Sequence, residues 1–331
     1  MSTGLMIGID IGGTKTLMIV TDREGSILAQ HKQPTIQARQ PSAFFMALFE
    51  QVHHLLSTID CTIADIEGIG IGLPGAVNVA TGVITHIPAL PLDGVSLIKQ
   101  IEPFYQGALY LDNDVNVAAL GEHWQGAGIG KKHMIMLTVG TGIGGAVILN
   151  DTLFRGADYT AGEVSYFVVD HQSEQRSLEV VNSHEFGRFE SHASGTGIGI
   201  YARQWLTSQQ ADATHPIVVH AGGDIEQVQA VDVLMLAQAG DSDAQEIMNV
   251  PIDYMAAGIA NMISLLNPEC VVIGGGVADS SYYIEQLRQR IQQFTPIHAQ
   301  LVPAVLGNVA GALGAVYGVL NDPLMMNPHS R

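Results

Sequence analysis

Two segments of the chain share one pattern of apolar and polar positions. Residues 6–22 read MIGIDIGGTKTLMIVTD, and residues 134–151 read MIMLTVGTGIGGAVILND. Each consists of an apolar run, a turn of glycine and threonine, a second apolar run and a polar stop. Such paired runs around a glycine-containing turn are typical of β-hairpins. The pattern therefore predicts two related halves, each opening with a hairpin that has a glycine-rich tip.

Further strands and helices are predicted at matching places in the two halves. Residues 67–78, EGIGIGLPGAVN, and 268–280, PECVVIGGGVADS, each combine an apolar strand with glycines. Between the strands, residues 41–60 carry apolar side chains at the spacing of an amphipathic helix: Phe45, Leu48, Val52, Leu55, Leu56 and Ile59. A buried helix is predicted over 253–266, with Pro251 in its first turn.

Two shorter helices complete the pattern, one after Asn113-Asp114 and one over 311–320. Strands alternating with helices in two related halves predict an α/β fold. Such halves close around a cleft, and ligands of α/β sheets bind at the carboxyl ends of the strands. We therefore expect the two glycine tips to face each other across the ligand site.

Composition narrows the class of protein. The 331 residues are 47% apolar and 14% charged, which suits two compact domains. The formal net charge of −18 disfavours nucleic acid and anionic membrane surfaces as partners. No apolar run approaches the roughly 20 residues of a membrane span, and the N-terminal segment is interpreted as a buried strand rather than a signal peptide. Cys61 and Cys270 form neither a disulfide framework nor a CxxC pair, so a cytoplasmic protein is expected.

The first glycine tip has the composition of an anion site. Gly12 and Gly13 would let backbone amides approach a phosphate, Thr14 adds a hydroxyl and Lys15 a positive charge. Asp10, at the strand end, could hold a hydrated Mg²⁺. A tight hairpin turn without a ligand explains the glycines equally well.

Two other glycine clusters suggest nucleotide binding. Residues 138–145, TVGTGIGG, hold more glycine than a hairpin requires, so a nest of amides for phosphate is the better interpretation. Gly274, Gly275 and Gly276 follow a strand and would leave a flat wall for an adenine or ribose. Close packing of the backbone explains these three glycines as well as a ligand does.

Three polar residues, Asp112, Asn113 and Asp114, end an apolar strand and open a helix. A polar cluster at this position is costly unless it is used. A helix cap by Asp112 or Asp114 would explain one carboxylate but not all three residues. Asn113 suits a sugar hydroxyl, Asp114 suits a general base in phosphoryl transfer, and Asn116 is expected to support the turn.

In order and spacing, these motifs resemble the ROK family of sugar kinases and repressors, in the hexokinase–actin–Hsp70 superfamily. The resemblance runs from GIDIGGTKT through GLPGAVN, LDNDVN, TVGTGIGGAV, AGEV, FESHASG and VVIGGGV to NVAGALGAV. It implies the two-domain actin-like ATPase fold, with duplicated ribonuclease H-like halves and a cleft between them. The expected domains are residues 1–116, joined by the C-terminal helix over about 308–321, and residues 117–307.

The resemblance also assigns roles to individual residues. It implies that residues 10–15 and 138–145 bind the phosphates of ATP, with Thr141 and Gly142 in the second turn. Gly275 and Gly276 would belong to the adenosine motif. Asp114 matches the catalytic base. The expected sugar-binding residues are Pro74, Gly75, Asn113, Glu163 and Glu190.

One region departs from the family pattern. Family members usually carry Gly-His after the AGE motif and a cysteine-rich run that together bind a structural zinc. Here Ser165-Tyr166 replace Gly-His, and residues 181–190 contain no cysteine. His171, His184 and His192 lie nearby at a spacing that fits no tetrahedral site, so no structural zinc is expected. Packing would hold the loop instead, through Phe186, Phe189 and Tyr166.

The same departure bears on the sugar pocket. The missing histidine normally contacts the sugar, so Tyr166 is expected to reshape the pocket. In addition, Ala89 stands where relatives often place a substrate-contacting asparagine. The preferred sugar therefore stays open.

The resulting hypothesis is a kinase that uses ATP and Mg²⁺ to phosphorylate a hexose or N-acetylhexosamine, with the 6-hydroxyl as acceptor by resemblance. The alternative is a catalytically silent sugar sensor of the same family, without the helix-turn-helix that precedes the core in ROK repressors. A chaperone-like or actin-like ATPase would leave Asn113, Glu163 and Glu190 without a purpose. By resemblance, a homodimer or homotetramer is expected.

Overall fold

The structure is a computed structural model that describes residues 4–85, 87, 90–169 and 187–321. Contacts divide the chain into two compact units. The first contains residues 1–132, 146–161 and 305–331, and the second contains residues 133–145 and 162–304. The domain boundaries expected at residues 116 and 307 stay a prediction. No helix among the described residues is long and apolar enough to cross a bilayer.

The first unit is built on a mixed five-stranded sheet with the order β3-β2-β1-β4-β7. The strands are β1 (Leu5–Ile11), β2 (Lys15–Thr21), β3 (Ile27–Pro34), β4 (Ile66–Leu73) and β7 (Ala108–Asn113). β1 pairs antiparallel with β2, from Met6 opposite Thr21 to Ile11 opposite Thr16, which confirms the first predicted hairpin. β1 and β4 pair in parallel, as do β4 and β7. The carboxyl ends of these three parallel strands therefore lie at one edge of the sheet.

Helices and short elements complete the first unit. They are α1 (Pro41–Ser57), η1 (Ile63–Asp65), β5 (Ala76–Asn78), β6 (Val83–Thr85), α2 (Leu97–Ile101), α3 (Asp114–Gln125), β10 (Thr152–Phe154), η5 (Gly307–Val309) and α10 (Ala310–Asn321). The apolar residues predicted for the helix over 41–60 are buried in the core, apart from Ile59, which is partly buried.

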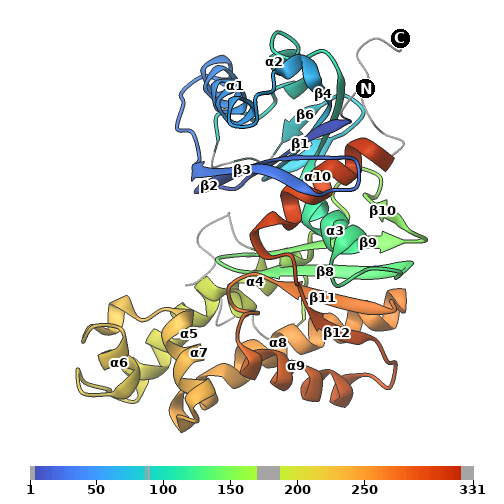
Figure 1. Ribbon diagram of the computed structural model, residues 1–331. Helices are drawn as coiled ribbons and strands as arrows, with labels where there is room; N and C mark the ends of the chain where they lie inside the picture. The colour runs from blue at the N-terminus through green and yellow to red at the C-terminus, as the bar shows by residue number, and fades with distance from the viewer. Residues whose placement is uncertain (1–3, 86, 88–89, 170–186, 322–331) are drawn as a thin grey trace. The chain divides into compact units, whose positions relative to one another are not determined.

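Helix α10, red in Figure 1, packs against β1, β4 and α3. The approach is so close that a Cβ on Gly8 would collide with the backbone of Ala312, and one on Gly70 with the backbone of Ala315. Glycine at these strand positions thus allows a helix to lie directly on the sheet. This packing brings the N-terminal turn of α10 to the end of β1.

The second sheet has the order β10-β9-β8-β11-β12. Its further strands are β8 (His133–Val139), β9 (Ile143–Leu149), β11 (Cys270–Gly274) and β12 (Gln300–Pro303). β8 and β9 are neighbours, as the second predicted hairpin requires. β11 pairs in parallel with both β8 and β12.

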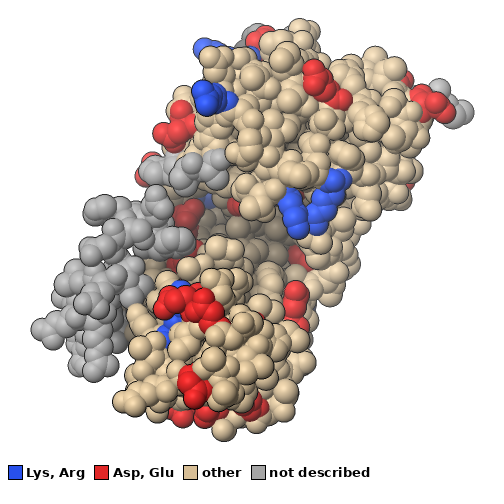
Figure 2. Space-filling model, turned by 90° about the vertical axis from the view of Figure 1, so that its left-hand side faces the viewer, with Lys and Arg blue, Asp and Glu red and all other residues tan. Residues whose placement is uncertain are grey.

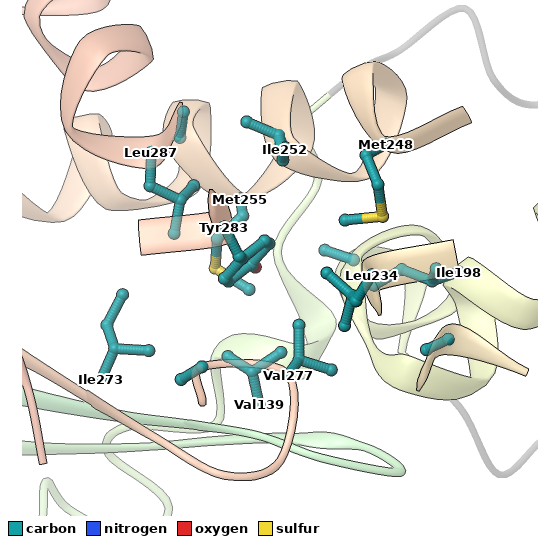
Figure 3. Packing of buried hydrophobic residues seen from close by; sticks show 14 of the residues in the cluster. Val139, Ile198, Leu234, Met248, Ile252, Met255, Ile273, Val277, Tyr283 and Leu287 are labelled. Carbon is teal, nitrogen blue, oxygen red and sulfur yellow. The ribbon is translucent and has the colours of Figure 1, made fainter. Parts of the chain in front are cut away.

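The second unit adds a group of helices to strands β8, β11 and β12. They are η2 (Val164–Tyr166), α4 (Arg188–Ala193), α5 (Gly195–Ser208), α6 (Pro216–His220), η4 (Ile225–Gln227), α7 (Ala230–Ala239), α8 (Ser242–Leu266) and α9 (Ser281–Phe294). Figure 3 shows their core, in which Tyr283 lies among Met255, Leu287 and Val277.

The predicted start of one helix is wrong. α8 begins at Ser242, where the Asp241 side chain accepts a hydrogen bond from the amide of Ala244, and Pro251 lies inside the helix. An internal proline removes one backbone hydrogen bond. Pro251 is nevertheless buried on the apolar side of the helix with Ile247 and Met255, and this burial offsets the loss.

Candidate functional site

In the first unit, Asp10 at the end of β1 lies next to another carboxylate and a helix terminus. A Cβ on Gly311, in the first turn of α10, would come within 2.6 Å of the Asp10 Cγ. The pKa of Asp10 is raised to about 7, mainly by burial and also by the charge of Asp114, whereas the charge of Lys32 lowers it. Asp10 and Asp114 are therefore electrostatic neighbours. The structure brings the predicted Mg²⁺ ligand and the predicted base together.

Two adjacent carboxylates that repel each other suit a divalent cation. Mg²⁺ prefers hard oxygen ligands and usually keeps several waters, using one or two carboxylates plus phosphate oxygens. Among the described residues, no group of three or more His, Cys, Asp or Glu side chains could hold a metal by itself. The Asp10 carboxylate thus fits a hydrated Mg²⁺ that a nucleotide brings with it.

The first glycine tip is exposed, and hydrogen bonds from Thr35 hold its shape. Gly13, Thr14 and Lys15 are exposed, whereas the amide of Gly12 donates to the carbonyl of Lys15 at 2.9 Å. Thr35 donates its hydroxyl to the carbonyl of Gly12 at 2.6 Å and its amide to the carbonyl of Thr14 at 3.0 Å. Two hydrogen bonds from a neighbouring segment therefore hold the shape of the exposed turn.

At the junction of β7 and α3, Asn113 is the helix cap. Its Oδ1 accepts hydrogen bonds from the amides of Val115 at 2.9 Å and Asn116 at 3.3 Å. The alternative of a cap by Asp112 or Asp114 is therefore wrong, because the residue between them performs that function. Asp114 is the first residue of α3, and its Oδ1 accepts from the amide of Val115 at 2.9 Å.

Asn113 also joins the cap to the loop predicted to line the sugar pocket. Its Nδ2 donates to the carbonyl of Gly75 at 3.0 Å. Gly75 has a φ of +97°, a left-handed conformation that favours glycine. The structure thus brings together Asn113, Pro74-Gly75 and, next in sequence, Asp114.

Asp112 has a partner that the sequence did not reveal. It is buried, and its Oδ2 accepts from Nε of Arg155 at 2.8 Å and from the hydroxyl of Tyr110 at 2.8 Å. Its Oδ1 accepts from the Nδ2 of Asn116 at 2.7 Å, which confirms that Asn116 supports the turn. Arg155 follows β10 and carries no motif, so only its position after an apolar strand marks it in the sequence.

In the second unit, the other glycine tip is hydrogen-bonded on two sides. The amides of Gly195 and Thr196, at the start of α5, donate to the carbonyls of Gly140 and Thr141 at 2.7 and 3.3 Å. The amide of Ile143 donates to Oε2 of Glu190 at 2.6 Å. The structure therefore connects one predicted sugar-binding residue directly to the predicted phosphate turn.

The environment of Glu190 raises the pKa of its carboxyl above the ordinary value. Burial raises the pKa of Glu190, the hydrogen bond from Ile143 lowers it, and the nearby charge of Glu163 raises it. Gly142 packs so tightly against Glu190 that an added Cβ would collide with its Oε2. Glu163, Glu190 and Gly142 thus belong to one cluster.

A cavity of about 960 Å³ lies beside this tip within the second unit. Thr141, Thr196 and Gly276 line it together with α7, whose Val231, Leu234 and Met235 form an apolar wall. Its size is at the upper end of the range for small-molecule sites. Asp279 and Arg203 are the charged side chains in this lining.

Close packing explains one of the glycines at 274–276, and a ligand site explains another. Gly275 has a φ of +90°, and a Cβ there would lie 2.5 Å from the carbonyl oxygen of Val139, so packing explains it. No atom lies within 4 Å of a Cβ added to Gly276, and Gly276 lines the cavity. Gly142 does not line the cavity and instead supports Glu190.

The segment around Tyr166 differs from expectation. Tyr166 is 66% exposed, so its predicted contribution to packing is wrong. Phe189 is buried, with its ring 6.0 Å from that of Phe167 and against Gly258. Phe167 therefore makes the contact expected of Tyr166. The predictions for Ala89, His171, His184 and Phe186 fall outside the described residues.

Acidic side chains lie in several separate places on the face drawn in Figure 2, in keeping with the net charge of −18. Such a surface repels nucleotide phosphates at long range. Attraction must come from local groups, namely the amides of the glycine tips, Lys15 and a cation. The two tips provide such groups in both units.

Comparison with known proteins agrees with this geometry. The sequence profile described as ROK family matches residues 6–321. A glucokinase of Halalkalibacterium halodurans is 30% identical over 319 residues, covering 95% of this chain and 94% of that protein. The crystal structure of a ROK family glucokinase from Streptomyces griseus in complex with glucose and AMPPNP has a TM-score of 0.76 and 28% identity, covering 95% of this chain and 98% of that one.

A regulator is also among the relatives. The xylose repressor of Caldicellulosiruptor bescii is 26% identical over 326 residues, which cover 97% of this chain and 79% of the repressor. Kinases and repressors therefore share the region that this chain spans. The match with solved kinases confirms the predicted two-domain actin-like fold.

Proposed function

The chain belongs to the ROK family, and we propose that it is an ATP-dependent kinase that phosphorylates a hydroxyl of a hexose or N-acetylhexosamine. The observation that supports this most directly is the junction of β7 and α3. There, Asp114 lies beside Asp10, while Asn113 caps the helix and binds the Gly75 loop. A base, a cation ligand and a sugar-binding amide thus share one small region.

Asp114 is the group we assign to the proton transfer. Phosphoryl transfer passes through a loose transition state, so positioning of the hydroxyl matters more than the strength of the base. Asp114 accepts the proton of the attacking hydroxyl as the bond to the γ-phosphate forms and the bond to ADP breaks. The amide of Val115 and the N-terminus of α3 keep Asp114 oriented.

The sugar is held by amide and carboxylate groups. Asn113 can donate its second Nδ2 hydrogen to a hydroxyl oxygen, because its Oδ1 already accepts from Val115 and Asn116, and the Pro74-Gly75 loop borders it. Glu163 and Glu190 accept hydrogen bonds from further hydroxyls. Tyr166, which is exposed, is proposed to contact the sugar at the edge of this group and to influence its choice.

The nucleotide is assigned to two sets of groups. We assign the adenosine to the cavity lined by Gly276 and α7, whose apolar wall suits a purine. We assign the phosphates to the amides of Gly13 and Thr14 in the first turn and of Thr141 and Gly142 in the second, because the amides of Gly12, Gly140 and Ile143 already donate within the protein. Mg²⁺, bound to Asp10 through water, would neutralise phosphate charge.

An ADP-release assay tests this proposal. Glucose, mannose, fructose, allose, N-acetylglucosamine and N-acetylmannosamine are each supplied with ATP and Mg²⁺, and phosphorus NMR of the product identifies the hydroxyl. The 6-hydroxyl is the proposed acceptor. Asp114→Asn should reduce kcat by roughly 1000-fold, the combined loss of proton acceptance and orientation, while calorimetry still detects sugar binding.

The match with a xylose repressor favours a second candidate, a sugar-responsive regulator without catalysis. Such a protein would bind one of these sugars but release no ADP, and Asp114→Asn would change neither property. Sugar binding without ADP release in the wild type would therefore replace the kinase proposal with the regulator.

A further inference from the structure

Arg155 and Asp112 form a buried ion pair directly before the proposed base. Their side chains are 7% and 2% exposed, and Nη2 of Arg155 lies 2.8 Å from Oδ2 of Asp112. Nη2 also donates to the hydroxyl of Tyr110 at 2.8 Å, and Tyr110 donates to the same carboxylate oxygen. Arginine, tyrosine and aspartate thus close a small hydrogen-bonded ring in the first unit.

The other oxygen of Asp112 faces the helix that carries the base. Oδ1 accepts from the amide of Asn113 at 2.8 Å and from the Nδ2 of Asn116 at 2.7 Å. One carboxylate therefore fixes the residue before Asp114 and a residue in the first turn of α3. Any rotation of Asp112 would move both of these contacts.

Energetics argue against stability as the reason for this arrangement. Burying an arginine and an aspartate costs several kcal/mol per ion, and well-packed apolar residues often serve stability equally well. The pair does supply direction, because a guanidinium can contact a carboxylate and a hydroxyl at fixed angles. A directional and costly contact next to a proposed reacting group indicates a positioning role.

Arg155 also begins a closed loop that leads to a second site residue. Its carbonyl accepts from the amide of Ala161 at 3.0 Å. Gly156 has a φ of +74°, and a Cβ added there would lie 3.2 Å from the Cβ of Ala161. Gly162 and Glu163 follow immediately in the chain. Arg155 therefore stands at the start of the loop that supplies one proposed sugar-binding carboxylate.

From these contacts we propose that Arg155, acting through Asp112 with Tyr110, is a positioning residue for phosphoryl transfer that sets the orientation of Asn113 and Asp114. The proposal rests on the kinase function proposed above. Arg155 itself touches no reacting atom in this scheme. Its loss should therefore lower the rate of transfer more than the binding of ATP.

Tyr110→Phe is the mildest test, because it removes one hydroxyl from the ring. Tyr105→Phe is the matched control, since Tyr105 is also buried in the first unit and donates its hydroxyl to the carbonyl of Ile66 at 3.4 Å. With glucose, or whichever sugar of the panel is the best substrate, Tyr110→Phe should lower kcat about tenfold and leave KM for ATP within about twofold. The control should keep both constants within about twofold of the wild type.

Two substitutions of the arginine extend the test. Arg155→Lys keeps the positive charge but loses the planar, two-pronged geometry of the guanidinium. Because a small displacement of a group near the reacting atoms slows the reaction strongly, kcat should fall about 100-fold. Arg155→Ala should be partly restored by guanidinium ion at low millimolar concentration, which can occupy the vacated space. A residue with only a structural role would show no such rescue.

The outcomes separate the two proposals. An active wild type whose Tyr110→Phe variant behaves like Tyr105→Phe, or whose Arg155→Lys variant keeps full kcat, overturns the positioning role alone. A wild type that releases no ADP with any sugar overturns the kinase function and this role together. A selective fall in kcat with guanidinium rescue supports both.

Discussion

The two glycine-rich tips have similar sequences but different surroundings. The tip at residues 12–15 is exposed and is held from below by Thr35, and Asp10 stands at its base. The tip at residues 140–145 is bound by α5 on one side and by Glu190 on the other. Each tip therefore has a carboxylate nearby, but only in the second does the carboxylate accept a hydrogen bond from the turn itself.

This difference indicates separate tasks for two similar turns. In the first unit, the carboxylate Asp10 has a raised pKa and suits a cation. In the second unit, Glu190 accepts from the amide of Ile143 and the carbonyl of Gly142 accepts from the amide of Gly140, so a ligand would meet the amides between these two. A sequence repeat thus predicts shared shape, whereas the neighbours of each copy determine its chemistry.

Among substitutions that compare the two tips, the largest expected effect comes from removing the charge at the first tip. Asp10→Asn should lower kcat for the best sugar by roughly 100-fold or more, because the cation that neutralises phosphate charge loses its carboxylate. Steady-state kinetics over a range of Mg²⁺ concentrations would measure this. Full activity at ordinary Mg²⁺ would show that the first tip needs no cation.

Asp10→Asn should lower activity but raise the stability of the fold when Mg²⁺ is absent. The pKa of Asp10 is raised to about 7 in the folded protein, above its ordinary value of 3.8, so the folded state favours the protonated acid. The contribution of protonated Asp10 to the free energy of unfolding is fully present below about pH 4 and is lost as the pH rises towards 7. Without Mg²⁺, Asp10→Asn should therefore be more stable than the wild type by roughly 1–3 kcal/mol at pH 8.

Urea unfolding at pH 5 and pH 8 measures this difference. The advantage of the variant should shrink at the lower pH, and Mg²⁺ with an ATP analogue should stabilise the wild type more than the variant. Equal stability of the two proteins at pH 8 would contradict the raised pKa of Asp10.

At the second tip, Glu190→Gln should have a smaller effect that falls mainly on the sugar. Glutamine can still accept the amide of Ile143, so the turn should keep its shape, but the hydrogen bonds to sugar hydroxyls lose their charge. We expect KM for the sugar to rise about tenfold while KM for ATP changes by less than about threefold. An equal rise in both constants would show that Glu190 mainly supports the phosphate turn.

The smallest effect comes from one added methyl group in the second tip. In Gly142→Ala the new Cβ would displace the flexible end of Glu190, so KM for the sugar should rise several-fold with little loss of stability. Gly140→Ala is the comparison for KM of the sugar alone, because no atom lies within 4 Å of a Cβ at that position, whereas KM for ATP is left out of the comparison since Gly140 lines the cavity. A similar KM for the sugar in the two variants would argue against contact between Glu190 and the turn as a determinant of sugar binding.

Much of the local structure could be predicted from sequence. Both hairpins, the helix after Asn113, α1 and α10 follow from apolar spacing and turn residues, because these signals act over a few neighbouring positions. The start of α8 could not be predicted in this way. Pro251 normally marks a helix terminus, and only the burial of α8 in the second unit makes its internal position acceptable.

Asp10, Asn113, Asp114 and the glycine turns were visible as polar groups at strand ends and as turn residues, whereas Glu163 and Glu190 were found only through the family resemblance. Their assignment to one family followed from the order of the motifs. The partners of these residues were not visible. Arg155 lies 43 positions from Asp112, and Glu190 lies 47 positions from Ile143. No local pattern joins residues at such separations.

By itself, then, the sequence determined the elements, the glycine tips and the identity of the polar groups at the strand ends. Only the tertiary structure decided that Asp112 pairs with an arginine, that Glu190 accepts from a backbone amide and that Asp10 lies beside another acid. The physical reason is that periodicity and turn chemistry are local, whereas burial and electrostatic environment depend on every element packed around a group. The pKa of Asp10 belongs to the second kind, since it depends on Asp114 and on α10.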